Sequence, residues 1–312
     1  MNKVSTCFLI SSLLLSNFVY AEKKDDISQY LQNISVTIKA DKGSGSGVIF
    51  TREIKSDEGK KKVNFVWTAA HVIEGVRSVR TILDVEGKTL KVPEFKDVQI
   101  VKKLIEDGVT VGELSMDAVV VKYSDATDGE DLALLMIKKF NFVDVSAKFY
   151  KDNENAGLPL GTQLYHVGSL LGESGANSMT TGIMSQVGRM LSLNGGSKVL
   201  FDQTTVTAFP GSSGGGVFLT DGQYIGMLVR GAGETFNLIV PIRRVHKWAK
   251  SENLLWALDV DQEAPTLEEI QKLPKEKSGS LGNLSPSLRF GDEPSKTLEY
   301  TESKKEVEIR LK

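Results

Sequence analysis

Residues 209–218 read FPGSSGGGVF, a turn of serine and glycine that leads into an apolar strand. A nucleophilic serine needs an exposed Oγ, backbone N–H groups aimed at a developing oxyanion, and no bulky Cβ nearby. The Gly-x-Ser-Gly-Gly pattern from Gly211 to Gly215 meets these needs at Ser213. A flexible Gly/Ser linker has a similar composition, so this turn alone leaves both interpretations open.

Two segments upstream supply the partners that such a serine requires. Residues 65–73 read FVWTAAHVI, so an apolar strand ends at two small alanines that leave room for the ring of His71. Residues 130–137 read EDLALLMI, in which Asp131 opens a continuous apolar run typical of a buried strand. A carboxylate enters a core only when it is paired, and a histidine Nδ1–H is such a partner. His71, Asp131 and Ser213 therefore make up a complete nucleophilic set.

Taken together, four segments resemble the trypsin-like serine endopeptidases, and most of all their cysteine-free bacterial HtrA-type branch. These segments are the opening GSGSGVI at 43–49, the histidine motif at 68–72, the aspartate motif at 131–134, and the residues 181–185 and 203–216 that lead into the serine. The resemblance extends over residues 34–248. The order His, Asp, Ser differs from that of subtilisins and α/β-hydrolases, which makes the combination specific.

The resemblance implies an all-β fold of two six-stranded antiparallel β-barrels, a C-terminal helix, and a cleft between the barrels. It implies that His71 is the base, that Asp131 orients it, and that the N–H groups of Gly211 and Ser213 form an oxyanion hole. Ser212 is the rival nucleophile, but the motif spacing favours Ser213. On the family pattern, the substrate pocket is lined by Thr207, Ala208, Val229, Arg230, Gly231 and Asn237. No acidic residue lies at its base, which predicts cleavage after small or medium apolar residues rather than after Lys or Arg.

Short strands separated by Gly, Asp and Asn turns dominate the sequence. We expect a trypsin-like protease domain over residues 22–258. Within it, the first barrel covers residues 34–142, the second covers residues 160–241, and a closing helix over residues 241–258 begins at Pro241.

Three further segments carry predictions of their own. Residues 1–21 combine an early lysine, an apolar run and small residues before Glu22, which predicts a secretory signal peptide and an exported protein, periplasmic or secreted. A retained N-terminal anchor is the alternative. Residues 95–121 predict an extended hairpin of unknown purpose. Residues 259–312, rich in Pro, Lys, Glu and Ser, predict a disordered charged tail in place of the PDZ domain of HtrA-type proteins.

Composition excludes several function classes. With 38 basic and 40 acidic residues, the chain has a net charge of −2 and lacks the excess of basic residues typical of proteins that bind nucleic acid. The one cysteine, Cys7, lies in the predicted signal, and three histidines without clustered cysteines or carboxylates give no metal pattern. His166 is interpreted as a hydrogen-bonded core residue and His246 as a surface residue of the closing helix. We expect no metal, no cofactor, no membrane span after signal removal, and polypeptides as partners.

The sequence thus predicts an exported serine endopeptidase that acts through an acyl-enzyme. Two alternatives remain open, a catalytically silent peptide-binding module of the same fold and an esterase or acyltransferase that uses the same triad. The intact triad disfavours the silent module. The residue order and strand pattern disfavour the esterase.

Overall fold

The computed structural model describes residues 27–41, 43–83, 87, 89–106, 108–151, 156–192, 196–233 and 235–276, and the backbone of 298–303 and 306–311. The predicted signal peptide at residues 1–21 lies outside the described residues, as does residue 277 onward apart from two terminal strands. In the part of the chain that is described, no helix is long and apolar enough to cross a membrane.

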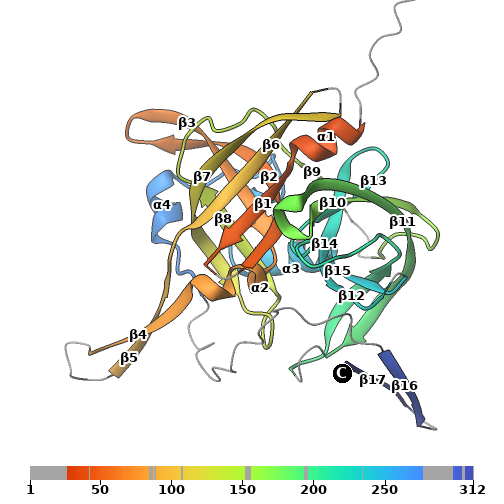
Figure 1. Ribbon diagram of the computed structural model, residues 1–312. Coiled ribbons are helices and arrows are strands. Elements are labelled where there is room, and N and C mark those ends of the chain that lie inside the picture. Colours follow the sequence, from red (N-terminus) through yellow and green to blue (C-terminus); the bar gives the residue numbers. More distant parts are fainter. Residues whose placement is uncertain are drawn as a thin grey trace, which may run out of the picture.

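Six antiparallel strands form the first predicted barrel, which is closed in the order β1-β2-β3-β8-β7-β6 (Figure 1). The strands are β1 Ser35–Ala40, β2 Gly43–Ser56, β3 Gly59–Thr68, β6 Val98–Glu106, β7 Val109–Ser124 and β8 Leu132–Ile137. Every residue of β8 is buried. Successive side chains point to opposite faces of a strand, so Leu135 faces the barrel interior while Leu134 joins the larger core outside it. This double burial is the reason for the continuous apolar run after Asp131.

The second barrel is a seven-stranded sheet in the order β13-β10-β11-β12-β15-β14-β9. Its strands are β9 Lys148–Phe149, β10 Gln163–Leu170, β11 Gly175–Leu191, β12 Val199–Thr204, β13 Gly216–Leu219, β14 Gln223–Gly231 and β15 Asn237–Pro241. An additional pairing between β13 and β14 closes six of these strands into a ring. The expected second six-stranded barrel is therefore confirmed, with β9 added to it parallel to β14.

The two barrels share one large core with the closing helix. That helix is α3, Ile242–Ser251, with Pro241 as its N-cap residue, so it ends seven residues before the predicted boundary at 258, and a separate turn, Leu255–Ala257, follows it. Trp67 of β3 packs edge-on against Trp248 of α3, with ring centroids 5.9 Å apart, and donates its indole N–H to the carbonyl of Ala257 at 3.1 Å. The remaining short helices are α1 Ile27–Asn33, α2 Ala70–Ile73, η1 Glu74–Val76, η2 Gly172–Ser174, η3 Leu255–Ala257 and α4 Leu267–Lys272.

The extended hairpin predicted within residues 95–121 is present as β6 and β7, paired from Val98 opposite Ala118. Both strands also pair with other strands of the first barrel, so the base of this hairpin is barrel wall. A second hairpin, β4 Arg77–Leu83 with β5 Thr89–Phe95, forms its own two-stranded sheet and projects from the barrel (Figure 1).

Residues 259–276 differ from the expected disordered tail, because they fold back onto the first barrel. Ile270 of α4 is 1% exposed, and a capping box between Thr266 and Glu269 begins that helix. Further along, Glu276 pairs with Arg77. Arg52 of β2 also donates to the carbonyls of Asp259 and Gln262, and the N–H of Tyr123 donates to the carbonyl of Lys275 at 2.8 Å, so long-range contacts order a segment whose composition indicates disorder. Strands β16 Leu298–Ser303 and β17 Glu306–Leu311 also pair, where no structure was expected.

Candidate active site

His71 and Asp131 are brought together by the pairing of β3 with β8. Strand β3 ends at Thr68 and β8 begins one residue after Asp131, and Thr68 lies opposite Ala133. His71 stands in the short helix α2 that follows β3. Its Nδ1 lies 3.0 Å from Oδ1 and 2.9 Å from Oδ2 of Asp131, and its backbone N–H donates to Oδ1 at 3.0 Å.

The charge state of Asp131 follows from this contact. Burial raises the pKa of Asp131, but the charge of His71, its hydrogen bonds and the charge of Arg230 together hold that pKa below its ordinary value. The carboxylate is therefore ionised at neutral pH and accepts a hydrogen bond from Nδ1–H of His71. This arrangement leaves the lone pair of the histidine on Nε2, where a general base needs it.

The backbone of Asp131 is in an uncommon conformation. Its φ of 54° is in the left-handed region, and its N–H donates to the carbonyl of Asp125 at 3.1 Å. Arg244 of α3 donates to the carbonyl of Glu130 at 3.1 Å and pairs with the Glu130 carboxylate. A cation of the closing helix thus fixes the residue before Asp131. Sequence analysis missed this role, because Arg244 and Glu130 are 114 positions apart.

The turn that carries Ser213 requires two of its glycines. Gly211 and Gly214 have φ of 92° and 85°, a region that side chains disfavour. A Cβ on Gly214 would lie 2.2 Å from the carbonyl oxygen of Ser46, and a Cβ on Gly211 would lie 2.2 Å from that of Ser169. The turn therefore packs directly against the backbones of β2 and β10, one from each barrel.

The two adjacent serines have different environments. Ser212 is 1% exposed, and its hydroxyl accepts the N–H of Phe209 at 3.1 Å, a bond within the turn itself. Ser213 is half-buried. These environments favour Ser213 over Ser212 as the nucleophile.

The serine and histidine segments meet at Gly45. A Cβ there would lie 2.5 Å from the side chain of Val72, the neighbour of His71, and 3.1 Å from the carbonyl oxygen of Ser213. Within the described residues, no hydrogen bond joins the Ser213 hydroxyl to the His71 ring. Catalytic hydrogen bonds are often long in enzymes without substrate and tighten in the complex.

Two backbone donors at the turn are available to a ligand. Among the described groups, the N–H groups of Gly211 and Ser213 donate to no acceptor. The carbonyl of Pro210, which shares its peptide plane with the Gly211 N–H, accepts the N–H of Leu171 at 2.7 Å. Because a trans peptide directs its C=O and N–H to opposite sides, this bond aims the Gly211 N–H away from Leu171.

Three of the six predicted pocket residues lie close together. A Cβ on Gly231 would lie 2.9 Å from the Cβ of Ala208 and 3.0 Å from Oδ1 of Asn237. Asn237 is fully buried, and its Nδ2 donates to the carbonyl of Val206 at 2.7 Å. Val229 differs from the expectation, because its side chain is 1% exposed and packs in the main core. At Val229, only the backbone is therefore left to line the predicted pocket.

The remaining two predicted pocket residues, Thr207 and Arg230, are half-buried. Arg230 lies close enough to Asp131 to lower the pKa of that carboxyl. Arg230 therefore acts on the aspartate through its charge, and in the sequence it directly precedes Gly231.

His166 has the predicted role of a core residue, and it lies beneath the serine turn. It is fully buried in β10 and its Nδ1 is 2.9 Å from the carbonyl oxygen of Gly216. A Cβ on Gly215 would be 2.7 Å from its ring. Burial lowers the pKa of His166 to about 4. His246 is half-buried on α3.

A family model described as the trypsin-like peptidase domain matches residues 45–227. The chain is 29% identical over 189 residues to the serine protease Do-like HtrA of Bacillus subtilis, a match that covers 59% of this chain and 33% of the relative. It is 30% identical over 183 residues to the protein of the same name from Lactobacillus helveticus, covering 59% of this chain and 34% of the relative. The chain thus spans about a third of the length of these curated relatives.

Among solved structures, the fold is similar to that of the HtrA-type protease AlgW with tripeptide. The TM-score is 0.51 at 18% identity, and the match covers 74% of this chain and 64% of that chain. The matched family model includes His71, Asp131 and Ser213 and extends over more than half of the sequence. The chain therefore belongs to the family of trypsin-like peptidase domains.

Proposed function

We propose that this protein is an exported serine endopeptidase that cleaves peptide bonds through an acyl-enzyme on Ser213. The observation that carries the proposal is the buried carboxyl group of Asp131, whose two oxygens lie 3.0 and 2.9 Å from Nδ1 of His71. Burying a carboxylate beside a histidine ring costs free energy, because the charge loses its water. The carboxylate in return holds the histidine in the tautomer that can accept a proton at Nε2.

The reaction follows the general template of a Ser-His-Asp triad. His71 Nε2 takes the proton of Ser213 as Oγ attacks the substrate carbonyl, and Asp131 stabilises the resulting imidazolium. The N–H groups of Gly211 and Ser213 receive the oxyanion, and each such donor lowers the barrier by about 3–4 kcal/mol. The imidazolium then protonates the leaving amine, after which water, activated by His71, hydrolyses the acyl-enzyme.

We propose that the pocket around Gly231 accepts small or medium apolar side chains at the residue before the cut. Ala208 and Asn237 narrow it, and no acidic residue stands among the predicted lining residues to neutralise a buried Lys or Arg. An unpaired buried charge costs several kcal/mol, about 3–5 when one partner of a pair is lost, so basic residues are excluded.

Export is proposed from residues 1–21 alone, with cleavage before Glu22. Intact-mass measurement of the protein recovered from the expressing cells checks this step. A mass that retains residues 1–21 would contradict it.

The peptidase proposal is tested by incubating protein that begins at Glu22 with a casein and, separately, with a short-chain ester. Casein fragments that disappear when Ser213 is replaced by alanine support the proposal. Ester hydrolysis without casein cleavage would indicate an esterase, and binding of casein fragments without any turnover would indicate a silent peptide-binding module.

A further inference from the structure

We propose that Ser46 is a positioning residue for the oxyanion hole, acting from the first barrel on the tripeptide Gly211–Ser213 of the second. The inference rests on the proposed peptidase function and extends it to a residue outside the triad. Ser46 lies in β2, is fully buried, and has no acid-base role.

Ser46 binds both ends of that tripeptide. Its hydroxyl donates to the carbonyl oxygen of Gly211 at 2.7 Å, and its backbone N–H donates to the carbonyl oxygen of Ser213 at 2.8 Å. The two residues whose carbonyls are held in this way are the same two that supply the oxyanion donors. One residue of the first barrel therefore holds backbone groups of both donor residues, through its side chain at Gly211 and through its backbone N–H at Ser213.

The direction of the Ser46 hydroxyl proton is fixed by a second bond. The Oγ accepts the N–H of Ser169 in β10 at 2.7 Å. A hydroxyl has one proton and two lone pairs, so with an N–H directed at its oxygen it sends its own proton to the carbonyl of Gly211. The Ser46 carbonyl is also held, by the Thr68 hydroxyl at 2.8 Å. All the polar groups of Ser46 are thus engaged.

The Ser46 hydroxyl binds the residue of the tripeptide whose own backbone is least restricted. Gly211 has no Cβ and a positive φ, so its own sterics restrict the following peptide plane only weakly. The planes on either side are fixed by neighbours, Pro210 by the N–H of Leu171 and Ser212 by the N–H of Gly215 at 3.0 Å. The peptide plane between Gly211 and Ser212 is held at its N–H by the carbonyl of Phe209 at 2.9 Å, and at its carbonyl by Ser46, which is its contact with the first barrel.

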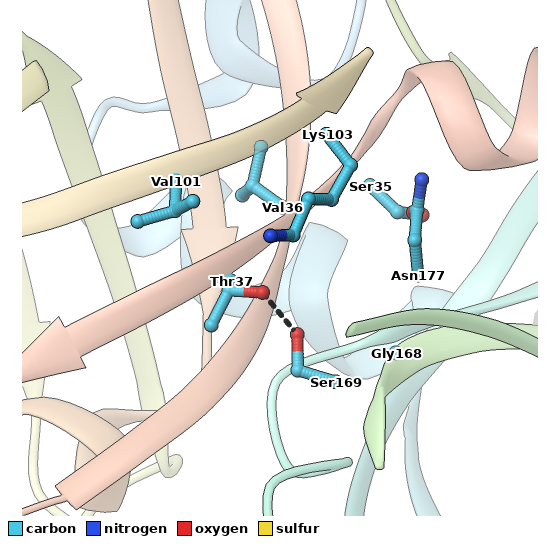
Figure 2. Close-up of a pocket in the computed structure, with 8 residues that line it drawn as sticks. All are labelled: Ser35, Val36, Thr37, Val101, Lys103, Gly168, Ser169 and Asn177. Atoms are coloured by element: carbon cyan, nitrogen blue, oxygen red, sulfur yellow. Dashed lines mark hydrogen bonds between the residues drawn. The ribbon is translucent and has the colours of Figure 1, made fainter. Parts of the chain in front are cut away.

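A second inter-barrel bond on the same side provides a matched control. Thr37 of β1 and Ser169 of β10 share a hydrogen bond between their hydroxyls, 2.5 Å long, across the seam of the two barrels (Figure 2). Thr37 is 2% exposed and lies opposite Ser46 in the pairing of β1 with β2. Its hydroxyl binds Ser169 and not the tripeptide, so Thr37→Val removes a buried inter-barrel bond without releasing Gly211.

The test compares Ser46→Ala with Thr37→Val in the protein that begins at Glu22. The alanine variant leaves the Gly211 carbonyl and the Ser169 N–H without their partner, so the peptide between Gly211 and Ser212 is held only at its N–H, by the carbonyl of Phe209 within the same turn. We expect kcat for a peptide substrate to fall about tenfold to a hundredfold, within the effect of losing one donor, and KM to change less than threefold. The affinity for a peptide boronate, whose tetrahedral adduct occupies the oxyanion hole, should weaken by the same factor as kcat. Thr37→Val should retain kcat.

Hydrogen exchange of the peptide spanning residues 205–218 supplies a readout that does not depend on catalysis. Exchange in this peptide should accelerate in Ser46→Ala and remain unchanged in Thr37→Val. If wild-type protein cleaves no peptide, the proposed function fails, and hydrogen exchange still decides whether Ser46 holds the turn. Unchanged kcat and exchange in Ser46→Ala, or equal losses of kcat in both variants, would overturn the inference.

Discussion

Asp131 accepts three contacts from His71, because Oδ1 receives the backbone N–H of His71 while both carboxylate oxygens face ring Nδ1. The backbone contact orients the carboxyl group independently of the ring. An amide placed at this position must keep its oxygen on the backbone N–H, which turns its NH₂ toward Nδ1. The substitution therefore changes the tautomer rather than the position of the ring.

The first prediction follows for Asp131→Asn. With an amide NH₂ at Nδ1, the ring carries its proton on Nε2 and cannot accept the serine proton. By the triad template, kcat falls on the order of 10⁴-fold near neutral pH. Steady-state kinetics with a peptide substrate measure the loss. The control is Asp128→Asn, an exposed residue of the preceding loop, which should retain full activity. Equal activity of the two variants would contradict the assignment of Asp131.

A second prediction separates the neighbouring serines. Ser213→Ala should lower turnover on the order of a millionfold, as in triad deletions, and leave the melting temperature within a few degrees. Ser212→Ala removes the acceptor of the Phe209 N–H, so it should lower the melting temperature and retain turnover within about tenfold, since one lost hydrogen bond is worth about 1 kcal/mol. Labelling with a fluorophosphonate reports the nucleophile directly. Label on the Ser213→Ala protein would refute the assignment.

The sequence predicted the buried strand after Asp131 and the glycine turn at Ser213 because both depend on local patterns, whereas the two-barrel class was predicted from the resemblance to trypsin-like endopeptidases. The apolar run after Asp131 marks a strand buried on both faces, and the glycines around Ser213 mark a turn with left-handed residues. Long-range partners leave no such signal. In the sequence, Arg244 is one of several basic residues in a predicted helix. Its ion pair with Glu130 forms only in the folded protein.

Ser46 shows the same limit at the site itself. In the sequence it is one serine in a Gly-Ser run, and its role depends on contacts with residues 123 and 165 positions away. Residues 259–276 are likewise ordered by long-range contacts, such as the burial of Ile270 against the first barrel and the pair of Arg77 with Glu276. Composition does not reveal such contacts. The side chain of Val229 was misplaced because strand alternation puts it in the core.

A third prediction concerns acid stability. The pKa of His166 is about 4 in the folded protein against 6.5 for an ordinary histidine, so the unfolded chain binds its proton first as pH falls. The free energy of unfolding should therefore decrease between pH 6.5 and pH 4 by about 3 kcal/mol from this residue, and no further below pH 4. Denaturant unfolding across this range measures the slope. His166→Asn keeps a donor for the Gly216 carbonyl and should remove most of the slope. An unchanged slope in that variant would assign the effect to other groups.

The last prediction concerns the substrate pocket. A side chain at Gly231 would stand 2.9 Å from the Cβ of Ala208 and 3.0 Å from Oδ1 of Asn237, so Gly231→Val must displace residues assigned to the wall of the substrate pocket. Wild-type protein should cleave a peptide library mainly after Ala, Val and Leu. Each methylene changes discrimination by about 1–3 kcal/mol, so the variant should lose cleavage after Val and Leu at least tenfold and retain hydrolysis of p-nitrophenyl acetate, whose acyl group leaves the pocket empty. The acetate is the internal control, because its hydrolysis reports an intact triad. Equal loss of both reactions would indicate damage to the triad. Dominant cleavage after Lys or Arg by wild-type protein would contradict the pocket assignment, because none of the residues assigned to the pocket is acidic and could neutralise a basic side chain.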